Sequence, residues 1–304
     1  MRGTLILNRD AGTLRGLDAE AAGAEIADIF RARGHAIDVR IAAGSEAIDA
    51  IREACAAKTE LVIVGGGDGT VSAAAGSAAE NGVALGILPL GTMNFFARSL
   101  AIPLELKPAA EALADGEIAE ADIARVNGRW FVHALALGLH PALVQEREKL
   151  EYKSRYGKML GSLRAWFRVI RASRRFNVFI ETDGVRVARR TAGVVVSNNP
   201  LGPGHMPYAD SLEDGLLALY VTTARGWLQL VRVTAAAALG TIAENPLVEI
   251  VETRAAEIHV GRRAVPVTLD GELLRLAGPL KVECVAKGVR VLRPRPVEAG
   301  DAAA

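Results

Sequence analysis

Glycine and aspartate residues gather directly after an apolar run at residues 61–64. Residues 65–70 read Gly-Gly-Gly-Asp-Gly-Thr, and a helix is expected to begin near Val71. Glycines let main-chain N–H groups approach a ligand closely, and a helix N-terminus adds partial positive charge suited to phosphate. A carboxylate alone would repel phosphate, so Asp68 indicates a bridging Mg²⁺, a sugar hydroxyl or a reacting group beside phosphates. The segment predicts a phosphate-binding loop, with a tightly packed structural turn as the alternative.

Two further polar loops follow predicted strands. Residues 89–98 read Pro-Leu-Gly-Thr-Met-Asn-Phe-Phe-Ala-Arg after the apolar run at 84–88, and residues 8–12 follow the first apolar run of the chain. Because parallel strands end at the same edge of an open sheet, we expect the three loops to converge on one crevice. The Gly-Lys-Ser/Thr of a P-loop is absent, and the glycine-rich loop follows the third strand rather than the first, unlike the dinucleotide-binding fingerprint.

The first third of the chain alternates short apolar runs with amphipathic segments. Strands are expected at residues 4–7, 36–41, 61–64 and 84–88, and a helix at 18–33 carries Ile26, Ile29 and Phe30 at helical spacing. Ser45 is expected to cap the next helix. This order predicts a doubly wound parallel α/β domain over residues 1–120.

The pattern changes to short strands and tight turns after residue 117. Asn127-Gly128 and Asp183-Gly184 each separate two β-like runs, as in hairpins. Further short strands are expected at 216–221, 247–251, 257–260, 265–269, 280–285 and 288–292. We therefore predict a mainly antiparallel β-sandwich domain with inserted helices at 121–292, and a C-terminal tail at 293–304.

Three motifs in this order resemble the signatures of the diacylglycerol-kinase catalytic-domain family. They are residues 65–70, residues 89–98 and the Leu-Asp-Gly-Glu of residues 269–272. That family includes bacterial lipid kinases, sphingosine kinases and ceramide kinases, and is related in fold to NAD kinases. The resemblance implies an NAD-kinase-like first domain and an ATP- and Mg²⁺-dependent lipid kinase that transfers the γ-phosphoryl group to a lipid hydroxyl, with a diacylglycerol-like acceptor.

The resemblance also assigns roles to residues of this chain. Asp270 would be the general base with Glu272 beside it, and Asp214 and Leu216 would hold a structural Mg²⁺. Arg155 or Lys158 would contact phosphate, and Asp68 would act at the reacting phosphates. The nucleotide-binding loops would contribute Asn8, Gly66, Gly67, Asp68, Gly69, Thr70, Gly91, Thr92 and Asn94.

Departures from the family pattern keep other functions open. Phe95 stands where family members commonly have a carboxylate, and Arg9 where they commonly have proline. The alternatives are a sphingoid-base or ceramide kinase, an NAD kinase, and a non-catalytic nucleotide- or lipid-binding regulator. The chain has no Asn-Glu dipeptide, which NAD kinases typically use, so NAD kinase ranks below lipid kinase.

Composition narrows the partners and the location. Lys and Arg number 36 against 35 Asp and Glu, a net charge of +1, so nucleic acid is not expected as a partner. Two cysteines far apart predict neither a disulfide framework nor a zinc site, and no uncharged stretch is long enough to span a bilayer, so a cytoplasmic protein is expected. The oligomeric state stays open, with a homodimer as one alternative.

One amphipathic helix is expected near residues 155–175. Its arginine flank suits an anionic membrane at the inner face, while packing of the apolar face inside the domain is the alternative. The flank consists of Arg164, Arg168, Arg171 and Arg175, and the apolar face of Met159, Leu160, Leu163, Trp166, Phe167 and Ile170.

Overall fold

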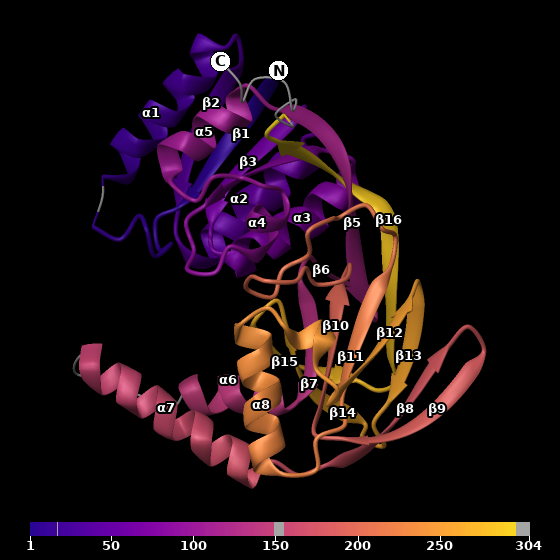
Figure 1. Ribbon diagram of the computed structural model, residues 1–304. Helices are drawn as coiled ribbons and strands as arrows, with labels where there is room; N and C mark the ends of the chain where they lie inside the picture. Colours follow the sequence, from indigo (N-terminus) through magenta and orange to yellow (C-terminus); the bar gives the residue numbers. More distant parts are fainter. Residues whose placement is uncertain (17, 149–154, 296–304) are drawn as a thin grey trace, which may run out of the picture. The chain divides into compact units, whose positions relative to one another are not determined.

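The computed structural model describes residues 1–16, 18–148 and 155–295 of the chain. The chain forms two compact units: Met1–Ile123 together with the segment from Lys287 onward, and Ala124–Ala286 (Figure 1). Two strands, β5 (Glu117–Val126) and β16 (Leu280–Arg293), contribute residues to both units.

The first unit is built on a parallel sheet. Its strands lie in the order β2-β1-β3-β4, and Arg290 and Val291 of β16 pair in parallel with β4. Almost every residue of β1, β3 and β4 is buried, as expected for strands covered on both faces. The predicted parallel α/β fold is confirmed. The strand bounds are β1 (Arg2–Asn8), β2 (Ala36–Ala42), β3 (Leu61–Gly66) and β4 (Ala84–Pro89).

Within the described residues of this unit, five helices accompany the sheet. Helix α1 packs with α5, and α2 packs with α3, so each pair covers one face of the sheet (Figure 1). Asp18 caps α1, its side chain accepting from the N–H groups of Glu20 and Ala21, and Ile26 and Phe30 are buried as the helical spacing predicts. The helices are α1 (Ala19–Ala32), α2 (Gly44–Ala56), α3 (Asp68–Asn81), α4 (Phe95–Ser99) and α5 (Leu106–Ala114).

Two predicted helix starts are wrong. Ala43 is the N-cap of α2 and makes no side-chain cap hydrogen bond, while Ser45 lies inside the helix. Helix α3 begins at Asp68 rather than near Val71, because the extended backbone of Gly67 already ends the strand segment. Asp68 therefore stands in the first turn of α3, where its negative charge is favourable.

The second unit is a sandwich of antiparallel sheets. One sheet has the order β12-β11-β10-β7-β14-β15. The other contains β13, β8 and β9 beside the first half of β16. A shared apolar core includes Phe131, Val178, Leu219 and Val267, which confirms the predicted β-sandwich. The strands are β7 (Ala134–Gly138), β8 (Phe176–Thr182), β9 (Val185–Thr191), β10 (Gly193–Asn198), β11 (Leu217–Thr222), β12 (Val248–Thr253), β13 (Ala255–His259), β14 (Ala264–Leu269) and β15 (Glu272–Ala277).

Both predicted Asn-Gly and Asp-Gly hairpins form. Asn127 and Gly128 have positive φ and join β5 to β6 (Arg129–Phe131), and Asp183 and Gly184 join β8 to β9 in the same way. Positive φ at both central residues matches the turn that suits the twist of paired strands.

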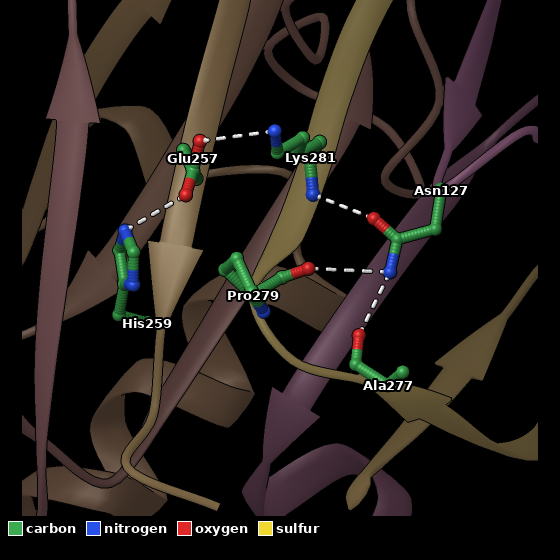
Figure 2. A network of polar contacts seen from close by, with 6 residues as sticks. All are labelled: Asn127, Glu257, His259, Ala277, Pro279 and Lys281. Atoms are coloured by element: carbon green, nitrogen blue, oxygen red, sulfur yellow. Dashed lines mark hydrogen bonds and ion pairs between the residues drawn. The ribbon is translucent and has the colours of Figure 1, made fainter. Parts of the chain in front are cut away.

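The Asn127 side chain does more than form a turn. Its Nδ2 donates to the carbonyls of Ala277 and Pro279 at 2.8 and 3.2 Å, and its Oδ1 accepts from the N–H of Lys281 at 2.8 Å (Figure 2). Asn127 thereby fixes the connection between β15 and β16. Beside it, Glu257 lies between Lys281 and His259 (Figure 2).

Two expectations about the last strands are wrong. The runs at 280–285 and 288–292 form one continuous strand, β16, and β15 was not expected at all. Lys287, at the point where a break was predicted, has a φ of 54° and its N–H donates to Asp122 Oδ1 at 2.8 Å. The carboxylate of Asp122, on strand β5, therefore stabilises the unusual backbone conformation of Lys287, and β16 continues through this residue.

Helix α6 contacts β7 and β14 of the sandwich, and α7 packs against both α6 and α8. Ile170 of α7 is buried with Leu230 and Val233 of α8, and Trp166 packs against the same cluster, whereas Arg164, Arg168 and Arg171 are exposed. The side chains of Met159, Leu160 and Leu163 lie outside the described residues. No helix in the described ranges is both long and apolar enough to cross a membrane. The bounds are α6 (Leu139–Glu148), α7 (Arg155–Ala172), α8 (Trp227–Ala238) and the 3₁₀ turn η1 (Ile242–Glu244).

Candidate functional site

The glycine-rich segment connects β3 directly to α3. Gly66 ends the strand, Gly67 is the N-cap of α3, and Asp68 is the first helical residue. A Cβ on Gly66 would lie 2.6 Å from Cβ of Thr70, so only glycine lets the helix turn back over the strand end. No side chain caps the N-terminus of α3, and residues 67–70 are partly exposed. The main-chain N–H groups here have the character of an anion site.

Asp68 joins this loop to the second glycine-containing loop. Its Oδ1 accepts from the N–H of Phe95 at 2.9 Å, and its Oδ2 accepts from the N–H of Asn94 at 3.1 Å. Both N–H groups stand at the start of α4, so the carboxylate caps that helix from another element.

Asn94 shapes the second loop from within. It adopts the left-handed conformation at a φ of 52°, its Oδ1 accepts from the N–H of Gly91 at 2.9 Å, and its Nδ2 donates to the Gly91 carbonyl at 2.9 Å. A Cβ on Gly91 would lie 2.7 Å from Cα of Gly67. The main chains of the two loops therefore touch, and the predicted convergence of the loops is seen in the first unit.

The loop after β1 joins the same edge. Asn8 Nδ2 donates to Thr70 Oγ1 at 3.2 Å, and Thr13 donates through both its N–H and its Oγ1 to the Leu90 carbonyl at 3.2 Å. Thr92 is exposed at the tip of the second loop. The structure thus brings together every residue of the predicted nucleotide-binding set from Asn8 to Asn94.

The described residues contain no group of three or more His, Cys, Asp or Glu side chains that could hold a metal ion. Mg²⁺ commonly binds through one or two carboxylates together with substrate phosphates and water, and Asp68 fits that mode. Asp214 is exposed and accepts from Ser211 Oγ at 3.0 Å, and the Leu216 carbonyl accepts from the N–H of Asn199 at 3.0 Å. This pair offers one carboxylate and one carbonyl, so most ligands of an ion there would be water.

Asp270 occupies the tight turn between β14 and β15 in the second unit. Asp270 and Gly271 both have positive φ, and Leu269 pairs with Glu272, so the segment is the hairpin turn that an Asp-Gly pair favours. Glu272 is exposed at the start of β15. The side chains of Arg155 and Lys158 lie outside the described residues.

The buried Asp270 carboxylate is bound by main-chain N–H groups. Its Oδ2 accepts from Val132 at 2.8 Å, and its Oδ1 accepts from His133 and Ala134, each at 2.9 Å. The N–H of Asp270 donates in turn to the Ala134 carbonyl at 2.9 Å. These bonds fix the turn against the start of β7 and hold the carboxylate in one orientation.

Further polar residues of this unit form hydrogen bonds at the ends of the neighbouring strands. Asn198 Nδ2 donates to the Val132 carbonyl at 3.3 Å, and its N–H donates to the His133 carbonyl at 2.9 Å. His140 is exposed as a residue, but its Nδ1 lies 2.7 Å from Thr268 Oγ1, and desolvation of the imidazole lowers the pKa of His140. None of these residues was predicted to have a role. Their only signal is polarity at strand ends, such as the two asparagines that follow the apolar part of β10.

Two protein-family models match the chain, and the boundary between them falls near the change from the α/β fold to the β-sandwich. The model of the diacylglycerol kinase catalytic domain matches residues 2–126, and that of the YegS C-terminal NAD kinase beta sandwich-like domain matches residues 148–293. Residues 2–126 therefore resemble the diacylglycerol kinase catalytic domain. The resemblance expected from the three motifs is confirmed.

Several relatives align with parts of the chain or with most of it. A diacylglycerol kinase of Mycobacterium tuberculosis (strain CDC 1551 / Oshkosh) is 29% identical over 283 residues, covering 88% of each chain. A "probable lipid kinase YegS-like" of Cronobacter sakazakii is 35% identical over 150 residues, which cover 46% of this chain and 50% of the relative. A further relative is matched over 55% of its own length. The chain therefore spans about half the length of this relative and of the Cronobacter sakazakii protein.

The fold is shared with a solved structure of a diacylglycerol kinase from Bacillus anthracis str. Sterne. The two agree with a TM-score of 0.73 over 97% of each chain, at 21% identity.

Proposed function

We propose that the protein is an ATP- and Mg²⁺-dependent lipid kinase that phosphorylates a diacylglycerol-like alcohol at the inner face of a membrane. The observation that carries the proposal is the contact between the two glycine loops of a domain in the diacylglycerol kinase family. Asp68 holds these loops together through two hydrogen bonds, and bare main chain lines their meeting point. The relatives named diacylglycerol kinase and lipid kinase support the same activity.

The loops supply what a nucleotide triphosphate needs. N–H groups of Gly67, Asp68 and Gly69 stand at the open N-terminus of α3 and would donate to phosphate oxygens. Asn8, Thr70, Gly91, Thr92 and Asn94 would complete the nucleotide site. Mg²⁺, when bound beside Asp68, supplies positive charge that neutralises the phosphates.

The lipid hydroxyl must lose a proton as it attacks. Its oxygen forms a bond to the γ-phosphorus, the bond from that phosphorus to the β–γ bridging oxygen breaks, and ADP leaves with that electron pair. We assign the proton to the carboxylate of Asp270, which the N–H groups of residues 132–134 hold in a fixed orientation. Glu272, two residues after Asp270 in the chain, would assist this proton transfer. Arg155 or Lys158 would offset negative charge on the phosphates.

The test is the Asp270→Asn variant, with Asp183→Asn as matched control. Both aspartates stand first in a positive-φ Asp-Gly hairpin turn, but Asp183 is exposed. A positioned base contributes about 10² to 10⁴ in rate, so Asp270→Asn is expected to lose at least about 100-fold in turnover while ATP affinity stays unchanged. Thermal unfolding of both variants separates this loss from damage to the turn. Full turnover in a folded Asp270→Asn protein would overturn the assignment.

The acceptor is identified by ATP consumption with a panel of alcohols. Diacylglycerol, sphingosine, ceramide and NAD are offered separately with Mg²⁺ and ATP, and the product is identified by mass. We expect phosphorylation of diacylglycerol. Phosphorylation of NAD alone would replace the lipid kinase with an NAD kinase, and ATP binding without consumption of any acceptor would favour the regulator.

A further inference from the structure

A basic pocket lies on the second unit, and none of the residues assigned to catalysis lines it. It has a volume of about 420 Å³ and is lined by Arg175, Arg189, Arg190 and Arg225 together with small and polar residues. No aspartate or glutamate lines it. The arginines come from three places in the sequence: the segment after α7, the end of β9, and the residues just before α8.

Three of the four positive charges lack a carboxylate partner in the described part of the chain. Arg189 is neutralised by a bidentate pair with Glu249, at 2.7 and 2.6 Å, which raises the pKa of Arg189. Arg175 instead donates to the main-chain carbonyl of Arg190. Arg190 and Arg225 are exposed. Guanidinium groups gathered in a concave site, with only Arg189 among the four paired with a carboxylate of the described residues, match the charge and geometry of a phosphate group.

Large apolar side chains stand directly beside this pocket. Trp227 and Leu228 follow Arg225 at the start of α8 and precede Gln229, which also lines the pocket. Trp227 is 39% exposed and Leu228 is 61% exposed, and Phe167 of α7, which is 41% exposed, lies with its ring 6.4 Å from that of Trp227. Arg171 lies over the Trp227 ring at 5.6 Å.

We propose that this surface, the Arg225 face, docks on an anionic lipid bilayer. A phospholipid phosphate would occupy the arginine pocket, while Trp227 and Leu228 would lie at the boundary between headgroups and acyl chains. Aromatic residues favour that boundary, and basic residues are attracted to anionic headgroups. The observations favour a bilayer over an acidic peptide, because the apolar residues protrude at the rim of the pocket and α7 continues the basic surface with Arg164 and Arg171.

The surface also resolves the two interpretations of the α7 helix. Trp166 and Ile170 pack against the α8 cluster, while the arginines of its flank are exposed. The helix therefore buries most of its described apolar face and presents charge, and the apolar contact with lipid falls to the neighbouring start of α8.

The test is co-sedimentation of the whole protein with vesicles, without ATP, so its outcome does not depend on the proposed kinase activity. Binding to vesicles of phosphatidylcholine that contain about 30% anionic phosphatidylglycerol is compared with binding to vesicles of pure phosphatidylcholine. Each basic residue near an anionic surface contributes about 1 kcal/mol, so Arg190→Gln with Arg225→Gln is expected to weaken binding about 10- to 30-fold. Arg262→Gln with Arg263→Gln removes the same charge from another exposed site of this unit and is expected to bind normally.

Two further measurements separate the parts of the proposal. Trp227→Ala with Leu228→Ala keeps the charge and is expected to weaken vesicle binding at high salt, where electrostatic attraction is screened. Soluble glycerol phosphate is titrated in parallel, to distinguish a free phosphate ligand from a lipid headgroup. Equal loss in the two double-arginine variants would overturn the proposal, as would equal binding to both kinds of vesicle. Binding of glycerol phosphate at the pocket by a protein that ignores vesicles would do so too.

Discussion

The carboxylate of Asp68 accepts a hydrogen bond from the N–H of Phe95, at 2.9 Å across 27 positions of sequence. A second bond, from Asn94, completes the cap on α4. Asp68 therefore has an architectural task in the first unit, whatever else it contacts. Phe95 stands where family members commonly carry an acidic side chain. The hydrogen bond to Asp68 uses only the main-chain N–H of Phe95, so it does not depend on which side chain stands at that position.

Removal of the Asp68 carboxylate should loosen the second loop. Asp68→Ala leaves two N–H groups at the start of α4 without their acceptors, and hydrogen bonds to charged groups contribute about 1.5–3 kcal/mol each. We expect the free energy of unfolding to fall by about 2–4 kcal/mol and ATP affinity to fall with it. Urea denaturation and calorimetric titration measure the two effects. Asp49→Ala removes an exposed carboxylate from α2 and serves as the control; similar stability in both variants would contradict the capping role.

Contact between the glycine loops predicts intolerance at Gly91. The Cβ of Gly91→Ala would lie 2.7 Å from Cα of Gly67 and 2.8 Å from Asn94 Oδ1, so main chain must move. Overpacking of this kind costs about 1–3 kcal/mol, and the displaced loop should bind ATP at least several-fold more weakly. Gly12→Ala is the control, because its Cβ would meet only the Leu90 carbonyl at 3.9 Å. Unchanged ATP affinity in Gly91→Ala would show that the contact is not needed for binding.

Cys55 offers a probe of opening in the first unit. Its side chain is fully buried, and burial raises the pKa of the thiol to about 11, so little reactive thiolate exists at neutral pH. In a Cys284→Ser variant, which leaves Cys55 as the single thiol, labelling by a disulfide reagent at pH 8 should be slow. It should accelerate steeply in urea as the unit unfolds. Rapid labelling of the native protein would contradict the packing around α2.

His205 should make stability depend on pH. Its hydrogen bond to the Met206 carbonyl, together with the Asp210 carboxylate at 2.7 Å, raises the pKa of His205 despite some burial. A histidine whose pKa is higher in the folded state stabilises it below the unfolded pKa, about 6.5, and loses this contribution as pH rises through the folded value. His205→Gln should therefore lower the melting temperature more at pH 5.5 than at pH 9. A constant difference across that range would argue against a charged His205.

Local chemistry made part of this architecture predictable. Asn127-Gly128 and Asp183-Gly184 form hairpins because positive φ at two consecutive positions is a local requirement. The buried strands of the first unit follow from their apolar runs. Ser45 misled because α2 already begins at Gly44, so Ser45 lies one residue past the start of the helix and cannot be its N-cap.

The candidate sites were less visible in the sequence, because their contacts join distant segments. The motifs identified Asp68 and Asp270. Nothing in the sequence near Asp270 shows that its carboxylate accepts hydrogen bonds from main-chain N–H groups that lie 136 to 138 positions earlier in the chain. The arginines of the Arg225 face are likewise scattered from residue 175 to 225, and only the strand order brings them to one pocket. β15 was missed because its sequence, Glu-Leu-Leu-Arg-Leu-Ala, does not alternate apolar and polar residues as a half-exposed strand usually does.

The pairing of β16 with β4 bears on how the protein is made. Arg290 and Val291 close the open edge of a sheet whose other strands were synthesised first, and Arg293 forms an ion pair with Glu117. During translation β16 cannot cover this edge of β4 until residues 290 and 291 have left the ribosome. A nascent chain halted before that point would display an unprotected strand to its neighbours on the polysome.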